Sequence, residues 1–160
     1  MCRRFLLALP LALLVGCVEG QKPTPLQRAG FAPAPAVQSL YERMGGEEVI
    51  VKVVDDFVAN VAADPNIKER HKKHFQEGDV AGLKKKLVDQ IGEAAGGPQK
   101  YTGKRMKEAH QGLEITDDDF DALVGDLVKA LDKNKVGPDE KGKLLQMLGT
   151  MRADVVEKPK

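Results

Sequence analysis

Three histidines are the residues of this chain best suited to bind a metal or move a proton: His71, His74 and His110. His71 and His74 lie three positions apart in KERHKKHF, which on a helix would place both on one side as a possible metal pair. Histidines in such a charged run are more often solvated, and no carboxylate or cysteine at ligand spacing completes a zinc site. His110 lies alone in KEAHQGLEIT, and the absence of a CxxCH run excludes covalent haem of the c type. The chemistry of His110 therefore depends on the elements around it.

Helices must position these histidines, because the chain from residue 39 onward shows helix periodicity and almost no strand alternation. Signals for helix ends agree with this. Ser39-Leu40-Tyr41-Glu42 matches a capping box, and two glycines and a proline stop a helix at 96–98. Thr116 can cap another helix, and Pro138 suits a first turn. The apolar stripes predict long helices over 47–62, 80–95, 117–131 and 138–155. The folded part of the chain is thus predicted to be all-α.

The first 17 residues, MCRRFLLALPLALLVGC, read as an export signal. They begin with Arg3 and Arg4 and continue with an apolar run shorter than the roughly 20 residues that span a bilayer. The ending LVGC resembles a bacterial lipobox, in which Cys17 receives a diacylglyceryl group and becomes the new N-terminus. An ordinary signal peptide with an incidental cysteine is the alternative. We therefore expect residues 1–16 to be a signal peptide.

Residues 17–38 are expected to comprise the lipidated Cys17 and a tether rich in proline and alanine, which cannot bury enough surface to fold alone. The folded domain is predicted to cover residues 39–156, with residues 157–160 as a flexible tail. The prediction is an exported bacterial lipoprotein, anchored to a membrane through its lipid and facing the periplasm or the cell exterior.

Composition sets limits on partners. Cleavage after residue 16 removes two basic residues and no acidic ones, which leaves 23 Lys+Arg against 24 Asp+Glu and a formal charge of −1. No net field therefore favours nucleic acid as a partner. The basic run Lys84-Lys85-Lys86 is flanked by leucines at helical spacing, which is typical of a solvated helix face. The chain has no tryptophan and modest side-chain bulk, so either a large apolar cofactor or a small alanine and valine core would fill its middle.

Four segments together resemble the group I truncated haemoglobins: SLYERMGGEE (39–48), VVDDFVANVAADP (53–65), GGPQKYTGKRMKEAHQGLEIT (96–116) and DFDALVGDLVKAL (119–131). The resemblance covers residues 39–156, and the double glycines, YTG and AHQG are its strongest elements. It implies a truncated globin fold, a two-over-two helical sandwich around non-covalent haem b. It also implies that His110 is the proximal iron ligand, with its other ring nitrogen donating to a backbone carbonyl.

The resemblance carries over to further haem contacts one residue at a time. Phe75 matches the phenylalanine that packs against the haem face after the second helix. Tyr101 and Met106 match positions that border the porphyrin, and Tyr101 is placed to reach a propionate. The other expected haem contacts are apolar and would also suit plain core packing: Leu83, Leu87, Ile115, Phe120, Val124 and Leu148.

The sequence departs from the family where the gas would bind. The family commonly has a tyrosine and often a glutamine there, and this chain has Val58 and Leu87. Each hydrogen-bond donor to a gas ligand is worth roughly 1–3 kcal/mol in a dry pocket, or about tenfold to a hundredfold in affinity. Three arrangements remain open: an apolar pocket that discriminates weakly between gases, a pocket in which Gln90 supplies one donor, and a pocket in which His74 binds the iron as a sixth ligand.

The leading interpretation is a membrane-tethered haem protein that reversibly binds O₂, NO or CO. The sequence does not identify a redox partner. One alternative is a haem enzyme, either a nitric oxide dioxygenase or a weak peroxidase. The first needs an electron donor, and the second favours a distal acid–base group, which Val58 and Leu87 do not supply. Another alternative is a haem-free lipoprotein that keeps the globin fold.

Overall fold

The computed structural model describes residues 37–158. The predicted signal peptide, Cys17 and the predicted tether up to residue 36 lie outside this part of the chain, as do residues 159 and 160. Residues 37–158 form eight helices and no strand, with one isolated β-bridge between Thr116 and Lys158. None of these eight helices combines the length and apolar character needed to cross a membrane. The helices are α1 (Leu40–Met44), α2 (Gly46–Ala63), α3 (Glu69–Gln76), α4 (Val80–Ala94), α5 (Met106–His110), α6 (Asp117–Lys133), α7 (Pro138–Thr150) and α8 (Arg152–Val155).

The helix ends follow the capping signals in the sequence. Ser39 begins α1 with the expected capping box: its Oγ accepts from the Glu42 N–H at 3.2 Å, and the Glu42 carboxylate accepts from the Ser39 N–H at 2.9 Å. Thr116 caps α6 in the same way, with Asp119 as the reciprocal partner. Between α1 and α2, Gly45 has a φ of 100°, and a Cβ there would come within 2.6 Å of a valine side chain of α2. This turn therefore requires glycine.

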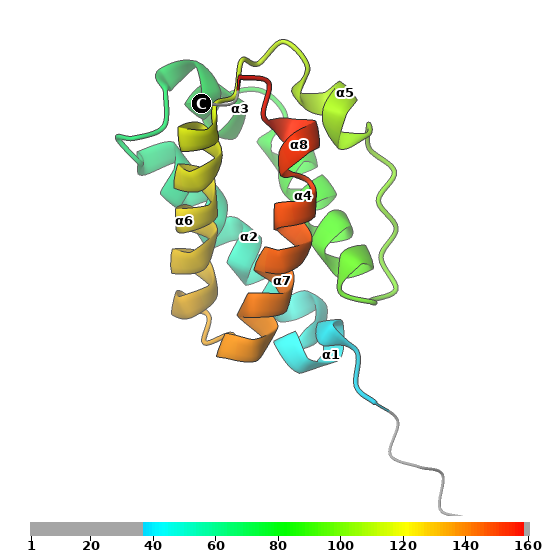
Figure 1. Ribbon diagram of the computed structural model, residues 1–160. Coiled ribbons are helices and arrows are strands. Elements are labelled where there is room, and N and C mark those ends of the chain that lie inside the picture. The colour runs from blue at the N-terminus through cyan, green and yellow to red at the C-terminus, as the bar shows by residue number, and fades with distance from the viewer. Residues whose placement is uncertain (1–36, 159–160) are drawn as a thin grey trace, which may run out of the picture. The chain divides into compact units, whose positions relative to one another are not determined.

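The core forms around α2, which packs against α4 and α6. Ile50, Val53 and Val61 of α2 and Leu131 of α6 have no exposed surface. Burying a side chain of this size contributes roughly 1.5–3 kcal/mol. The helices α6 and α7 form one layer in front of α2 and α4 (Figure 1). The all-α, two-over-two arrangement predicted from the sequence is confirmed.

Two segments of helix differ from the predicted boundaries. The helix expected over 138–155 is divided, because the Met151 N–H bonds to the Leu148 carbonyl at 3.0 Å in a tighter turn, so that α7 ends and α8 begins around this residue. The helix α3 was not predicted from periodicity. Phe75 is its only large apolar side chain, so no stripe marks it. Its position depends on contacts with α2 and α4.

Of the expected tail, residues 157 and 158 lie in the described part of the chain. The backbone N–H groups of Glu157 and Lys158 both donate to the Ile115 carbonyl, at 2.9 and 3.1 Å. Lys158 also forms the β-bridge with Thr116. Residues 157 and 158 are therefore held against the connection between α5 and α6.

Candidate functional site

A cavity of about 490 Å³ lies inside the helical domain. Its size falls within the roughly 300–1,000 Å³ typical of cofactor and ligand pockets. Every helix except α1 contributes to its walls, and most of the lining is apolar. The residues predicted as haem or gas contacts that line it are Phe75, Leu83, Leu87, Gln90, Tyr101, Met106, His110, Ile115, Phe120 and Leu148.

Two predicted contacts lie elsewhere. Val58 of α2 is 5% exposed and packs in the core, while its neighbour Phe57 lines the cavity. Val124 of α6 is half-buried outside the lining, and its neighbour Leu123 lines the cavity instead. Successive residues of a helix point about 100° apart, so an error of one position turns a side chain away from the cavity.

Sequence reasoning missed other lining residues. Some apolar ones sit on helices whose stripes were visible, but nothing in the sequence shows which part of a stripe borders a cavity. Ile67, Ala109 and Leu113 lie in connections or in the short helix α5, where no stripe marks them. His71 was noted as half of a possible metal pair but not as a cavity residue, and the other charged residues gave no signal, because charge within a helical run normally indicates a solvated face. The residues missed are Phe57, Ile67, His71, Lys86, Lys104, Ala109, Leu113, Asp119, Leu123, Met151 and Val155.

His110 lies at the last position of α5, a helix of five residues, and is half-buried. Its Nδ1 lies 2.7 Å from the backbone carbonyl oxygen of Met106, one helical turn earlier. In the neutral imidazole this contact requires the proton on Nδ1, which leaves the lone pair on Nε2 available. In histidines that bind a metal through one ring nitrogen, a hydrogen bond from the other ring nitrogen, such as this one, fixes the orientation of the ring.

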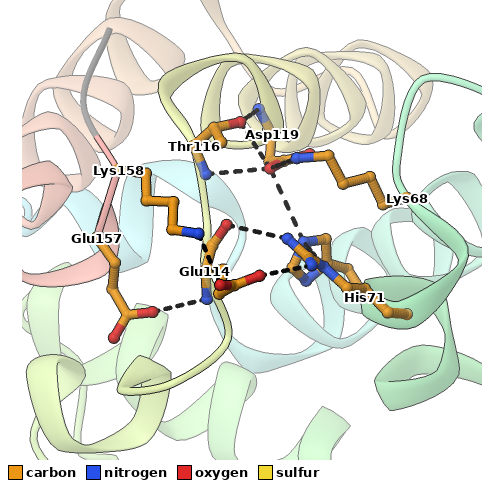
Figure 2. A network of polar contacts seen from close by, with 8 residues as sticks. Lys68, His71, Glu114, Thr116, Asp119, Glu157 and Lys158 are labelled. Carbon is orange, nitrogen blue, oxygen red and sulfur yellow. Dashed lines mark hydrogen bonds and ion pairs between the residues drawn. The ribbon is translucent and has the colours of Figure 1, made fainter.

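Polar side chains gather where α3 meets the start of α6 (Figure 2). Asp119, which lines the cavity, is 8% exposed, and its Oδ2 accepts from Lys68 Nζ at 2.7 Å and from the Thr116 hydroxyl at 2.6 Å. Burial alone would raise the pKa of Asp119, but these hydrogen bonds outweigh it and lower the pKa to about 2. Its carboxylate is therefore ionised, and its charge is balanced by Lys68.

His71 and His74 both line the cavity from α3. His71 is buried, and burial is the main cause that lowers its pKa, so its imidazole is neutral near pH 7. Its Nε2 accepts from Arg70 Nε at 3.3 Å and lies 3.8 Å from the Asp119 carboxylate. His71 thus has one ring nitrogen engaged in the polar network, whereas His74 is exposed.

A second charged part of the lining comes from α4 and the connection that follows it. Lys86 and Lys104 line the cavity, and neither side chain forms an ion pair with any residue between 37 and 158. Tyr101 lines it too, and its hydroxyl donates to the Lys104 carbonyl at 2.8 Å. Burial raises the pKa of Tyr101, so the hydroxyl keeps its proton. The two lysines are therefore open to an anionic group.

Gln90 of α4 points its amide inward. Its Nε2 lies 3.2 Å from the sulfur of Met106 and 3.4 Å from the sulfur of Met151. Thioethers are weak acceptors, so a stronger acceptor in the cavity would compete for this amide. Gln90 also lines a smaller apolar cavity of about 100 Å³, together with Leu87 and Leu127.

These features fit a haem. In the part of the chain that the structure describes, no three His, Cys, Asp or Glu side chains gather as a metal site. A single imidazole such as His110 can hold an iron only if a cofactor supplies most of the other ligands, as a porphyrin does. The apolar walls suit the macrocycle, and Lys86 and Lys104 suit its carboxylates.

Comparisons with known proteins agree with this fit. The family described as "Bacterial-like globin" matches residues 39–157. The "Group 1 truncated hemoglobin GlbN" of Mycolicibacterium paratuberculosis is 33% identical over 117 residues, which are 73% of this chain and 83% of that protein. The "Group 1 truncated hemoglobin" of Tetrahymena pyriformis is 36% identical over 94 residues, which are 59% of this chain and 74% of that protein.

Solved structures are similar as well. The truncated hemoglobin from Tetrahymena pyriformis in its Fe(III) form superposes with a TM-score of 0.68 and 31% identity, covering 76% of this chain and all of that one. The 2/2 hemoglobin from Synechococcus sp., in the cyanomet state and with covalently attached heme, gives a TM-score of 0.66 and 31% identity over the same shares.

Proposed function

The chain belongs to the group 1 truncated haemoglobins, within the bacterial-like globins, and its cofactor is non-covalent haem; on this premise we propose that it reversibly binds a diatomic gas, O₂, NO or CO, with His110 as the protein ligand of the iron. The observation that carries the proposal is the 2.7 Å contact between His110 Nδ1 and the Met106 carbonyl oxygen, which leaves Nε2 as the available nitrogen in the wall of the cavity. When bound, haem supplies an iron with a coordination position for the gas.

The other residues of the cavity bind and orient the cofactor. Lys86 and Lys104 offer positive charge to the propionates, in place of the Tyr101 contact expected from the sequence, since that hydroxyl already donates to a carbonyl. Phe75 packs edge-on against Phe57, with ring centroids 6.1 Å apart, and contributes an apolar wall that excludes water.

The gas side of the pocket combines apolar surface with one donor. Leu87 supplies apolar surface, and the Gln90 amide supplies a donor whose present partners are two thioethers. We favour Gln90 as the residue that stabilises the gas, because its side-chain amide is a strong hydrogen-bond donor that contacts only two weak acceptors, the methionine sulfurs. Ligation by His74 is the competing arrangement.

The absorption spectrum tests the proposed ligand. Purified protein expressed with ample haem is expected to show a Soret band that shifts when the reduced form receives CO. In His110→Ala the band and the shift should be lost, because the cavity then offers the iron no protein ligand at that wall. His74→Ala, which removes an imidazole from the same cavity, is the matched control and should keep the CO shift. A wild-type protein without colour, or a spectrum indifferent to His110→Ala, would overturn the proposal.

We further propose that the protein is an exported bacterial lipoprotein, anchored to a membrane through Cys17. The support is the basic and apolar start of the chain, its LVGC ending and the proline-rich segment that follows. The folded domain would then bind its gas outside the cytoplasm, next to a membrane.

A further inference from the structure

The segment that follows His110 has a backbone conformation that needs support. Gly112 has a φ of 83°, and Glu114 has a φ of 54°, a left-handed conformation that is unfavourable for a residue with a side chain. Residues 111–116 connect α5 to α6, and Glu157 and Lys158 lie beside them (Figure 2). We call residues 111–116 the proximal loop.

Glu157 binds the proximal loop with both of its carboxylate oxygens. Its Oε1 accepts from the Gly112 N–H and its Oε2 accepts from the Glu114 N–H, both at 2.6 Å. The two hydrogen bonds lower the pKa of Glu157, so the side chain is ionised at neutral pH. Hydrogen bonds to an ionised acceptor are stronger than those between neutral groups. One side chain thus fixes the two positions of the loop that have positive φ.

Further contacts hold Glu114 from two sides. Lys158 Nζ lies 2.6 Å from Glu114 Oε1, and Arg70 Nη1 of α3 lies 2.7 Å from Glu114 Oε2. The backbone N–H groups of Glu157 and Lys158 donate to the Ile115 carbonyl. Residues 157 and 158 and α3 therefore hold the proximal loop together. Of these contacts, the hydrogen bond from Gly112 to Glu157 involves the loop residue closest in sequence to His110.

The contacts that hold the proximal loop also determine the position of His110. The helix α5 has only five residues and no side-chain cap at its start, and helices this short are not stable on their own. Its end joins the loop directly, since the Leu113 N–H donates to the His110 carbonyl at 3.1 Å. The helix α8, which leads into Glu157, packs against α5 (Figure 1). The orientation of the imidazole therefore depends on how firmly the loop is held.

We propose that Glu157 is a positioning residue of the haem site: its carboxylate fixes residues 112–114 and thereby holds α5 and the His110 imidazole in place. The inference rests on the proposed role of His110 as iron ligand. It adds a residue 47 positions away in the chain, one that does not itself line the cavity and whose backbone contact with the lining is the hydrogen bond to the Ile115 carbonyl.

The test is resonance Raman spectroscopy of the full-length ferrous protein, read at the iron–histidine stretch, with haem transfer to excess apomyoglobin as a second measurement. Glu157→Gln keeps the size of the side chain but loses the charge and one of the two acceptors. We expect its iron–histidine band to move to lower frequency and to broaden, and its haem to transfer several-fold faster. Glu157→Asp, which keeps both oxygens on a shorter arm, should show a smaller shift.

The control is Glu42→Gln in α1, which also removes a carboxylate that accepts from a backbone N–H, but that N–H belongs to Ser39 and not to the proximal loop. It should leave the band and the transfer rate unchanged. An unchanged band and rate in Glu157→Gln would overturn the positioning role while leaving the proposed function intact. Equal shifts in Glu157→Gln and Glu42→Gln would overturn it too, because the effect would then be general destabilisation. A wild-type protein with no iron–histidine band would overturn the proposed function and this inference with it.

Discussion

Replacing Asp119 by asparagine tests whether the polar network at α3 is a source of stability. A single oxygen of Asp119, Oδ2, accepts from Lys68 Nζ, the Thr116 hydroxyl and the Thr116 N–H, at 2.7, 2.6 and 3.0 Å. Asparagine keeps the shape, and its carbonyl can still cap α6, but it brings no charge for Lys68. The substitution therefore isolates the part of the network that depends on ionisation.

The expected size of the effect follows from the pKa. Hydrogen bonds lower the pKa of Asp119 from its ordinary value of 3.8 to about 2, against the opposing effect of burial. A difference of this size between the folded and unfolded chain corresponds to about 2 kcal/mol. Because the folded pKa is the lower one, this stability is fully present above pH 3.8 and is lost as the pH falls through about 2.

Urea denaturation followed by circular dichroism measures the effect. At pH 7, Asp119→Asn should lower the free energy of unfolding by about 2 kcal/mol relative to wild type. The difference should narrow once the pH falls below 3.8. Asp79→Asn is the control, because Asp79 caps α4 through the Gly82 N–H and forms no ion pair within residues 37–158. A loss in Asp119→Asn that is the same at every pH would refute the role of the charge.

Two further predictions concern the gas ligand and the anchor. Gln90→Leu should speed oxygen dissociation about tenfold or more, the value of one hydrogen bond of roughly 1–3 kcal/mol; equal stopped-flow rates in the two proteins would exclude Gln90 as the donor. Cys17→Ser should abolish labelling of the protein by a fatty-acid precursor in the producing bacterium and release it from the membrane fraction. Unlabelled wild-type protein would instead favour an ordinary signal peptide.

The long helices could be predicted from the sequence because each one buries a continuous apolar stripe. The capping box at Ser39, the cap at Thr116 and the proline at the start of α7 also depend only on residues a few positions apart. His110 was singled out by the segments around it, which resemble a known family, and not by any feature of the imidazole alone. Local patterns thus gave most of the fold and the residue on which the proposed function depends.

The polar part of the site could not be predicted, because its partners lie far apart in the sequence. Asp119 is 51 positions from Lys68, and Glu157 is 43 positions from Glu114. In the sequence each looks like a residue of a solvated helix face or a tail. Val58 and Val124 were wrongly predicted to line the cavity for a different reason: periodicity assigns a residue to a face of a helix but does not show which neighbour that face contacts.

The charges of the cavity predict the orientation of the cofactor. The Asp119 carboxylate contributes negative charge to the lining on the side of α3, and its balancing cation, Lys68, is not part of that lining. The positive charges of Lys86 and Lys104 enter from α4 and from the connection between α4 and α5. Haem carries two carboxylates on one edge and apolar groups on the opposite edge. Its carboxylates would meet repulsion near Asp119 and attraction near the lysines, so we expect one orientation, with the carboxylate edge toward the lysines.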